Sequence, residues 1–200
     1  GIVSPWNYPL YLIIGPLVDA FVAGNRAMVK ISEHVPKFAE TMANLVPQYF
    51  QADELTIVTG GVEVASAFSA LPFDHLLFTG STAVGKHVMR AAANSLTPVT
   101  LELGGKSPVI VFADANLDKA AETIAIGGFF NAGQDCTAAS RVLVEASVHD
   151  EFVNRLVAQA QALRFGEPTD EEALYGPLNN ERQMAHVSGF ISRLPAHAKI

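Results

Sequence analysis

Strand-like and helix-like stretches alternate along the first 104 residues, and this rhythm constrains the fold more than any other feature. The sequence predicts strands at 1–4, 27–31, 55–59, 75–79 and 98–103. It predicts helices at 10–24, 36–50, 62–71 and 82–95. Strands that alternate with helices form a parallel sheet covered on both faces, and the crossovers between them are right-handed. The fold class is therefore predicted to be α/β, with a doubly wound parallel sheet.

Polar and glycine residues follow the predicted strands, and a sheet of this kind binds ligands at the carboxyl ends of its strands. The turn Gly80-Ser81 leads into a helix whose free backbone N–H groups and dipole favour a phosphate. Its spacing matches neither a Walker loop nor the G-x-G-x-x-G fingerprint. From these residues alone, a diphosphate site and an ordinary tight turn are equally supported.

Two further strand ends carry side chains that can bind a nucleotide. Lys30, Ser32 and Glu33 follow one strand, where a carboxylate can accept from ribose hydroxyls and a lysine can donate to them. The alternative is a solvated Lys–Glu pair. Asn7 follows the first strand as a neutral donor, and on the local sequence alone a plain turn asparagine is the better interpretation.

The rhythm changes after Lys106, and we place a domain boundary near Gly104-Gly105. The second part is predicted to contain strands at 107–112 and 140–146 and helices at 117–130, 148–164 and 178–194. The prediction is a dinucleotide-binding domain over 1–104, followed over 105–200 by part of an α/β domain that carries the cysteine.

The only cysteine, Cys136, has Gln134, Asp135 and Thr137 as close neighbours rather than an apolar run. Lone cysteines are more often inert than reactive. Glu102, however, ends an apolar strand just before a paired-glycine turn. A thiol nucleophile and a carboxylate base, each beside glycines, are the groups that covalent catalysis needs.

Composition excludes some partners. The net charge is −7, from 13 basic and 20 acidic residues, and nucleic acid or an anionic membrane would require a basic face. A single cysteine forms no internal disulfide, which favours a reducing, cytoplasmic compartment.

The longest apolar run is broken by Gly15-Pro16 and is predicted to be a buried helix. The six histidines lack metal-ligand spacing, so no metal is expected. The chain begins like a strand entered midway and stops where another strand could begin, which is expected of an internal piece of a longer protein.

Five motifs occur in order and together resemble the aldehyde dehydrogenase superfamily. They are Pro5-Trp6-Asn7, Lys30-x-Ser32-Glu33, Phe78-Thr79-Gly80-Ser81-Thr82, Glu102-Leu103-Gly104-Gly105-Lys106 and Asn131-Ala132-Gly133-Gln134-x-Cys136. The portion up to about residue 108 is similar to bacterial coniferyl-aldehyde dehydrogenases. The portion from about residue 132 is similar to aminobutyraldehyde dehydrogenases. An aromatic aldehyde and an ω-aminoaldehyde are therefore both candidate substrates.

The resemblance implies the catalytic roles. Cys136 attacks the aldehyde and forms a thiohemiacetal, while the Asn7 amide and the Cys136 backbone N–H form the oxyanion hole. Hydride passes to NAD(P)+, and Glu102 activates the water that hydrolyses the resulting thioester. A glutamate before two glycines also has the backbone freedom to move aside during hydride transfer.

The resemblance also implies a cofactor site. Its residues are Pro5, Trp6, Lys30, Ser32, Glu33, Gly80, Ser81, Val84, Leu103 and Gly104. Glu33 would repel a 2′-phosphate, so NAD is favoured over NADP. Two positions depart from the family pattern. Ile31 replaces a proline and adds an N–H donor and a bulky side chain, and Ala65 replaces a glycine with a methyl group that would crowd its helix.

Alternatives from other functional classes remain. The chain could be a truncated or non-catalytic nucleotide-binding relative that associates with other subunits, or a cysteine hydrolase with a histidine near Cys136. The full-length parent is expected to be a homodimer or homotetramer. The 200 residues alone are expected to be inactive or a poor enzyme.

Overall fold

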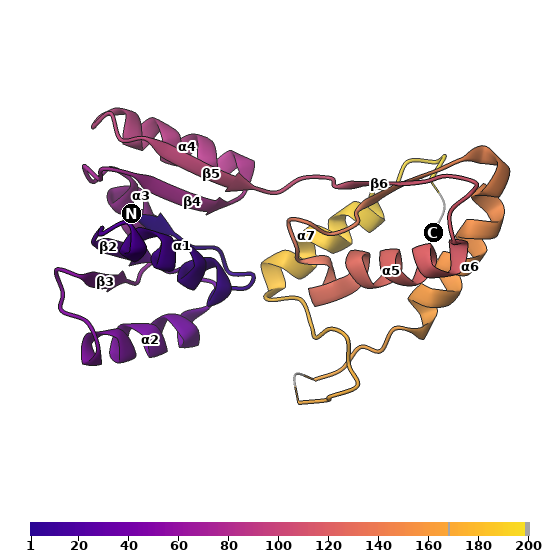
Figure 1. Ribbon diagram of the computed structural model, residues 1–200, viewed down its shortest axis with the longest axis horizontal. Coiled ribbons are helices and arrows are strands. Elements are labelled where there is room, and N and C mark those ends of the chain that lie inside the picture. Colours follow the sequence, from indigo (N-terminus) through magenta and orange to yellow (C-terminus); the bar gives the residue numbers. More distant parts are fainter. Residues whose placement is uncertain (168, 199–200) are drawn as a thin grey trace. The chain divides into compact units, whose positions relative to one another are not determined.

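The computed structural model of the protein describes residues 1–167 and 169–198. The chain divides into two compact units (Figure 1). The division falls between Gly104 and Gly105. Unit 1 is Gly1–Gly104, and unit 2 begins at Gly105.

Unit 1 contains a five-stranded sheet in the order β3-β2-β1-β4-β5, and every neighbouring pair of strands is parallel. The strands are β1 (Ile2–Val3), β2 (Ala27–Lys30), β3 (Leu55–Val58), β4 (Leu76–Gly80) and β5 (Val99–Leu103). The helices are α1 (Tyr11–Val22), α2 (Pro36–Leu45), α3 (Val62–Ser69) and α4 (Thr82–Ala93), with a short 3-10 turn at Val46–Gln48. The predicted parallel sheet is confirmed.

The two faces of this sheet are covered by different helices (Figure 1). Ile13 of α1 and Met42 of α2 share one apolar cluster with the β2 residue Val29. Phe68 of α3 and Val88 of α4 belong to a second cluster, built on β4. Because successive residues of a strand point to opposite faces of the sheet, a single strand can supply side chains to both clusters. The sheet is therefore doubly wound, as predicted.

Helix α1 differs from the expectation of a fully buried helix. Ile13 and Leu17 are its buried residues, whereas Tyr11 is 77% exposed and Val22 is 84% exposed. Only the stripe that faces the sheet finds an apolar partner among the described residues. The sequence pattern was apolar all round, so it could not indicate which face packs.

Helix α2 also ends earlier than predicted. It stops at Leu45 and continues as the 3-10 turn Val46–Gln48, instead of running to about residue 50. Pro47 has no backbone N–H and its ring crowds the preceding turn, so the regular helical hydrogen bonding cannot continue through it.

Unit 2 contains a two-stranded parallel sheet, formed by β6 (Pro108–Val111) and β7 (Arg141–Val144). Its helices are α5 (Leu117–Phe129), α6 (His149–Ala162) and α7 (Glu181–Ser192), and 3-10 turns lie at Phe130–Gly133 and Ala146–Val148. The core joins Val111 of β6 to Ile124 of α5 and Phe152 of α6, whose side chain is fully buried. A two-stranded sheet is marginal alone, so the packing of α5 and α6 stabilises it.

Candidate functional site

The strand order places a topological switch point between β1 and β4. The chain runs from β1 through β2 to β3 on one side, then crosses over to β4 on the other side of β1. Val3 of β1 pairs with Phe78 of β4, so the segments after these strands leave the sheet beside each other. Ligands of open α/β sheets bind at this kind of point. The predicted residues of the β1 loop and of the Gly80-Ser81 turn both belong to it.

The β1 loop is anchored at its start. Ser4 and Pro5 are buried, and the Ser4 backbone N–H donates to the Lys30 carbonyl at 3.0 Å. Trp6 and Asn7 are half-buried. Tyr8 has φ 49°, in the left-handed region that non-glycine residues rarely adopt. The left-handed Tyr8 turns the chain sharply out of the loop and into α1.

The turn after β4 begins helix α4. Ser81 caps this helix, because its Oγ accepts from the Val84 backbone N–H at 3.3 Å. Gly85 lies so close to β5 that an added Cβ would come within 3.1 Å of Leu103 Cδ2. The absence of a side chain at Gly85 therefore lets the first turn of α4 approach the end of β5. The structure thus brings together Ser81, Val84 and Leu103, which the sequence predicted as cofactor contacts.

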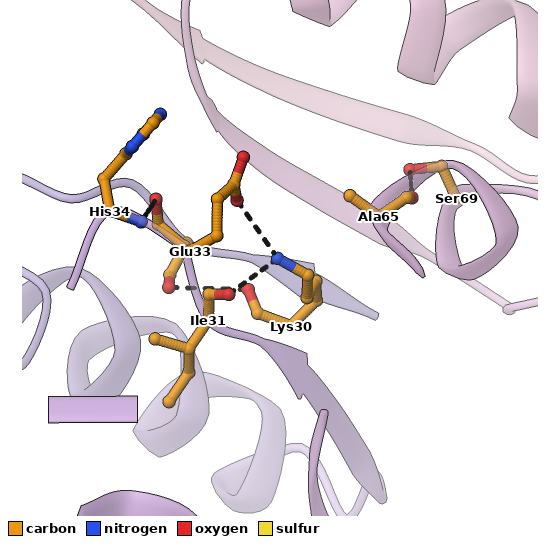
Figure 2. A network of polar contacts seen from close by, with 8 residues as sticks. Lys30, Ile31, Glu33, His34, Ala65 and Ser69 are labelled. Atoms are coloured by element: carbon orange, nitrogen blue, oxygen red, sulfur yellow. Dashed lines mark hydrogen bonds and ion pairs between the residues drawn. The ribbon is translucent and has the colours of Figure 1, made fainter. Parts of the chain in front are cut away.

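Lys30 is 1% exposed and ends β2 (Figure 2). Its Nζ donates to the Ile31 carbonyl at 2.7 Å and to Glu33 Oε2 at 3.4 Å. The Ser32 hydroxyl oxygen accepts from the His34 backbone N–H at 3.3 Å. A buried, partnered ammonium group differs from the solvated Lys–Glu pair considered as the alternative. The positive charge of Lys30 is therefore fixed at the end of β2 by these two hydrogen bonds.

Glu33 is the more accessible member of this pair, with 35% of its side chain exposed. Partial burial acts to raise the pKa of Glu33. The hydrogen bond from its own backbone N–H and the positive charge of Lys30 outweigh burial, so the pKa lies below the ordinary value of 4.5. Glu33 therefore presents a carboxylate, an acceptor for hydroxyl groups, at neutral pH.

Ile31, one of the two departures from the family pattern, has a clear structural role. Its N–H donates to the Val58 carbonyl at 3.1 Å and extends the pairing of β2 with β3 beyond Lys30. Its side chain is fully buried in the cluster under α1 and α2. Ala65, the other departure, lies on α3, and its carbonyl accepts from Ser69 Oγ at 2.8 Å (Figure 2).

A pocket of about 480 Å³ opens beside Glu33. Its lining comes from the segment after β2, one side of α2 and the segment after β3: Ile31, Ser32, Glu33, Pro36, Ala39, Glu40, Ala43, Asn44, Thr59, Gly60 and Gly61. Sequence reasoning missed Glu40 and Asn44. The available signal was their spacing along α2. Glu40 follows Pro36 by four residues and Asn44 follows Glu40 by four, and residues four apart share a helix face.

Glu102 lies on the edge strand β5 and pairs in register with Thr79 of β4. Leu101 and Leu103, its neighbours in the strand, pack into the cluster under α3 and α4. Successive strand residues alternate in direction, so the exposed Glu102 belongs to the opposite face. The carboxylate is therefore accessible at the carboxyl end of the sheet. Gly104, also predicted as a cofactor contact, ends unit 1 and is exposed.

In unit 2, the Cys136 segment (residues 131–138) follows helix α5 through an unusual turn. Asn131, Ala132 and Gly133 have φ values of 52°, 57° and 71°, so three consecutive residues are left-handed. Gln134 behind them is 9% exposed. Left-handed residues other than glycine store strain that surrounding contacts must offset.

Cys136 itself is exposed on a tight turn. The Thr137 N–H and hydroxyl donate to Asp135 Oδ1 at 2.9 and 2.8 Å, and the Ala138 N–H donates to the Asp135 carbonyl at 3.3 Å. Ser107 Oγ donates to the Cys136 carbonyl at 3.5 Å. Within residues 1–167 and 169–198, the Cys136 N–H donates to no acceptor. The residue thus offers both a thiol and a backbone donor.

All the predicted site residues except Cys136 belong to unit 1. Among the residues that the structure describes, no three His, Cys, Asp or Glu side chains form a cluster that could hold a metal ion. Over the same residues, no helix has both the length and the apolar character needed to cross a bilayer.

Comparison with known proteins identifies relatives. A sequence profile described as the aldehyde dehydrogenase family matches residues 1–200. A probable coniferyl aldehyde dehydrogenase of Pseudomonas aeruginosa is 50% identical over 193 residues, covering 96% of this chain and 40% of that protein. A dimeric NADP-preferring aldehyde dehydrogenase of Rattus norvegicus is 43% identical over 190 residues, covering 95% and 42%. The similarity to the bacterial protein is thus not confined to the first half of the chain.

Solved structures show the same fold. An aldehyde dehydrogenase of Mycobacterium tuberculosis in complex with NAD+ matches with a TM-score of 0.90 and 37% identity, over 96% of this chain and 40% of that one. This chain therefore spans about 40% of the length of the relatives it matches.

Proposed function

This chain belongs to the aldehyde dehydrogenase family, and from that premise we propose that it carries the nucleophile and the main cofactor loops of an enzyme that oxidises an aldehyde to a carboxylic acid. The observation that carries the proposal is that Cys136 is exposed on a tight turn and that its backbone N–H has no acceptor among the described residues. An inert packing cysteine needs neither feature.

Cys136 supplies the covalent chemistry. Its thiolate adds to the aldehyde carbon, and the carbonyl oxygen becomes the oxyanion of a thiohemiacetal. The Cys136 N–H is available to donate to that oxygen. The family resemblance assigns the second donor to the Asn7 side-chain amide. Two donors aimed at a developing negative charge lower the barrier where charge appears.

Bound NAD(P)+ would accept the hydride, which leaves an acyl thioester on Cys136. The resemblance assigns the next step to Glu102, whose exposed carboxylate takes a proton from water as that water attacks the thioester carbonyl. The carboxylic acid then leaves and the thiol is regenerated. Glu102 lies two residues before Gly104, in an edge strand that other strands pair on one side only.

The strand ends of unit 1 fit a dinucleotide. The pocket beside Glu33 offers a carboxylate for ribose hydroxyls, and Lys30 fixes that carboxylate. The capped start of α4 offers backbone N–H groups for a diphosphate. Glu40 adds a second carboxylate to the same pocket, and two negative charges disfavour a 2′-phosphate. We therefore propose NAD rather than NADP, although the family contains proteins of both kinds.

The substrate and the assembly are proposals as well. Coniferyl-type aromatic aldehydes come first, because the bacterial relatives of that description match most of the chain. ω-Aminoaldehydes are the second class to test. We propose a homodimer or homotetramer for the full-length parent, acting in the cytoplasm.

The test uses the fact that Cys136 is the only cysteine, so any thiol reagent reports on it alone. The chain is incubated with NAD+ and coniferyl aldehyde, and its intact mass is followed. An acyl adduct on Cys136 is expected, which persists longer in Glu102→Gln and is absent from Cys136→Ser. Nucleotide binding without an adduct would favour the non-catalytic alternative. The acyl adduct is two hydrogens lighter than the thiohemiacetal, and an acyl adduct that forms equally without NAD+ would contradict the hydride step.

Turnover is the second measurement. Because the chain spans about 40% of its relatives, we expect NADH release to be very slow even where the adduct forms. Sustained NADH release by the 200 residues would show that they suffice for the whole cycle.

A further inference from the structure

Gln134 makes a set of hydrogen bonds that the catalytic proposal does not use. Its side chain is buried, two residues before the exposed Cys136. Its Nε2 donates to the Asn131 carbonyl at 3.0 Å, and its Oε1 accepts from the Asn179 backbone N–H at 2.9 Å. One side chain thus joins the Cys136 segment to a loop 45 residues further along the chain.

The same residue closes the left-handed turn. The Asn131 side-chain amide donates to the Gln134 carbonyl at 3.2 Å, while the Gln134 backbone N–H donates to the Asn131 carbonyl at 3.1 Å. Asn131 and Ala132 both have positive φ, a conformation that costs about 1 kcal/mol or more for each residue. The contacts between Asn131 and Gln134 therefore hold a backbone shape that the chain would otherwise leave.

We propose that Gln134 is a positioning residue for Cys136: its amide ties the left-handed turn at 131–133 to the Asn179 backbone, and this tie aims the Cys136 N–H at the oxyanion. That Cys136 is acylated rests on the proposed function, whereas the tie itself rests on the hydrogen bonds. Gln134 acts through the backbone of the next two residues and touches no reacting atom.

The experiment compares two reactions of the same thiol. p-Nitrophenyl acetate acylates a thiolate through a tetrahedral oxyanion and releases p-nitrophenolate, whereas iodoacetamide alkylates by displacement of iodide without one. Both rates are proportional to the fraction of Cys136 present as thiolate, so their ratio does not depend on that fraction. The ratio therefore reports on oxyanion stabilisation. Removing one oxyanion donor costs about 100-fold or more in other enzymes, and a misaimed donor loses part of that.

Gln134→Met preserves side-chain length and burial but removes the side-chain hydrogen bonds to Asn131 and Asn179. We expect the acylation-to-alkylation ratio to fall about tenfold, with alkylation within about twofold of the parent. Amide exchange at Asn179 should accelerate about tenfold as its acceptor is lost. The matched control is Gln161→Ala, on the exposed surface of α6, which should leave all three values unchanged. A ratio within twofold of the parent in folded Gln134→Met overturns the positioning role.

A second pair of variants keeps the test decisive if Gln134→Met does not fold. Asn179→Pro deletes the N–H that donates to Gln134 and leaves Gln134 intact, whereas Asn179→Ala keeps that N–H. The ratio should fall further in the proline variant than in the alanine variant, which removes only the side chain of Asn179. Equal ratios in the two variants overturn the proposal. A parent chain that acylates no faster than free cysteine rejects the proposed function instead, and the Asn179 exchange rate still judges the tie.

Discussion

The Lys30–Glu33 cluster in unit 1 and the Cys136 segment in unit 2 hold their polar groups in opposite ways. Lys30 ends a central strand of a buried sheet, and regular strand pairing fixes its backbone. Cys136 follows three left-handed residues on an irregular turn, and side-chain hydrogen bonds from Gln134 fix that backbone. The first site is part of the core, whereas the second depends on a few specific contacts.

Because of this difference, a substitution in unit 1 should affect folding and function together, whereas a substitution in unit 2 can affect function alone. A change at Lys30 disturbs the packed sheet and the proposed nucleotide site together. A change at Gln134 is expected to misaim a reactive group in a unit that still folds. Each prediction below tests one side of that contrast.

The largest effect is expected from Lys30→Ala. The substitution leaves a cavity and removes the donor to the Ile31 carbonyl and to Glu33. We expect the free energy of unfolding to fall by about 2–4 kcal/mol in urea denaturation, with loss of 5′-AMP binding. Lys37→Ala, an exposed residue of α2, is the control and should change stability by less than about 0.5 kcal/mol. A loss below about 1 kcal/mol at Lys30 would mean that this site is not part of the core.

Backbone strain in the Cys136 segment should give the next largest effect. Gly133 has φ 71°, and an added Cβ would meet only ordinary contact, 3.5 Å from the Gly128 carbonyl oxygen. Gly133→Ala should therefore cost about 1–2 kcal/mol from left-handed strain alone. Thermal unfolding of the two proteins measures it.

The opposite substitution provides the control at the neighbouring position. Ala132→Gly should be neutral or stabilise by up to about 0.5 kcal/mol, because relief of strain at φ 57° offsets the entropy of glycine. If both substitutions destabilise equally, the left-handed turn is not the origin of the effect.

Cofactor choice should respond to Glu40 by a smaller amount. Glu40→Gln removes one negative charge from the pocket. We expect the affinity for 2′,5′-ADP relative to 5′-AMP to rise about threefold to fivefold, which is roughly 1 kcal/mol or less. Calorimetric titration at low salt measures both ligands. Asp19→Asn, on the exposed side of α1 and not in the pocket lining, should leave the ratio unchanged.

The smallest effect concerns pH. The folded pKa of Glu33 lies below the 4.5 expected for the unfolded chain, so its contribution to stability is complete above pH 4.5 and is lost as pH falls through the folded pKa. An NMR titration of the Glu33 carboxyl should give a midpoint below 4.5. In Lys30→Met the midpoint should rise, because the positive charge is gone. An unchanged midpoint would assign the shift to the backbone hydrogen bond and to His34 instead of Lys30.

Much of unit 1 could be predicted because its pattern is repetitive. Four alternations of strand and helix specify a parallel sheet, and residues after strand ends meet at one edge by topology. Ser81, Lys30 and Glu33 were predicted as site residues in this way. Glu40 was missed because it lies on a helix face that the motif does not include. The exposure of Tyr11 and Val22 was missed because an all-apolar helix does not indicate which face packs.

The sequence by itself determined the strand–helix rhythm, the family and the identity of Cys136, because these depend on residue type and order. Only the tertiary structure decided that Lys30 is buried, that a pocket opens between α2 and the ends of β2 and β3, and that Gln134 reaches the Asn179 backbone. The physical reason is the distance along the chain over which each interaction acts. Periodicity and turn chemistry act between near neighbours, whereas burial and a hydrogen bond across 45 residues arise only when distant segments are packed together.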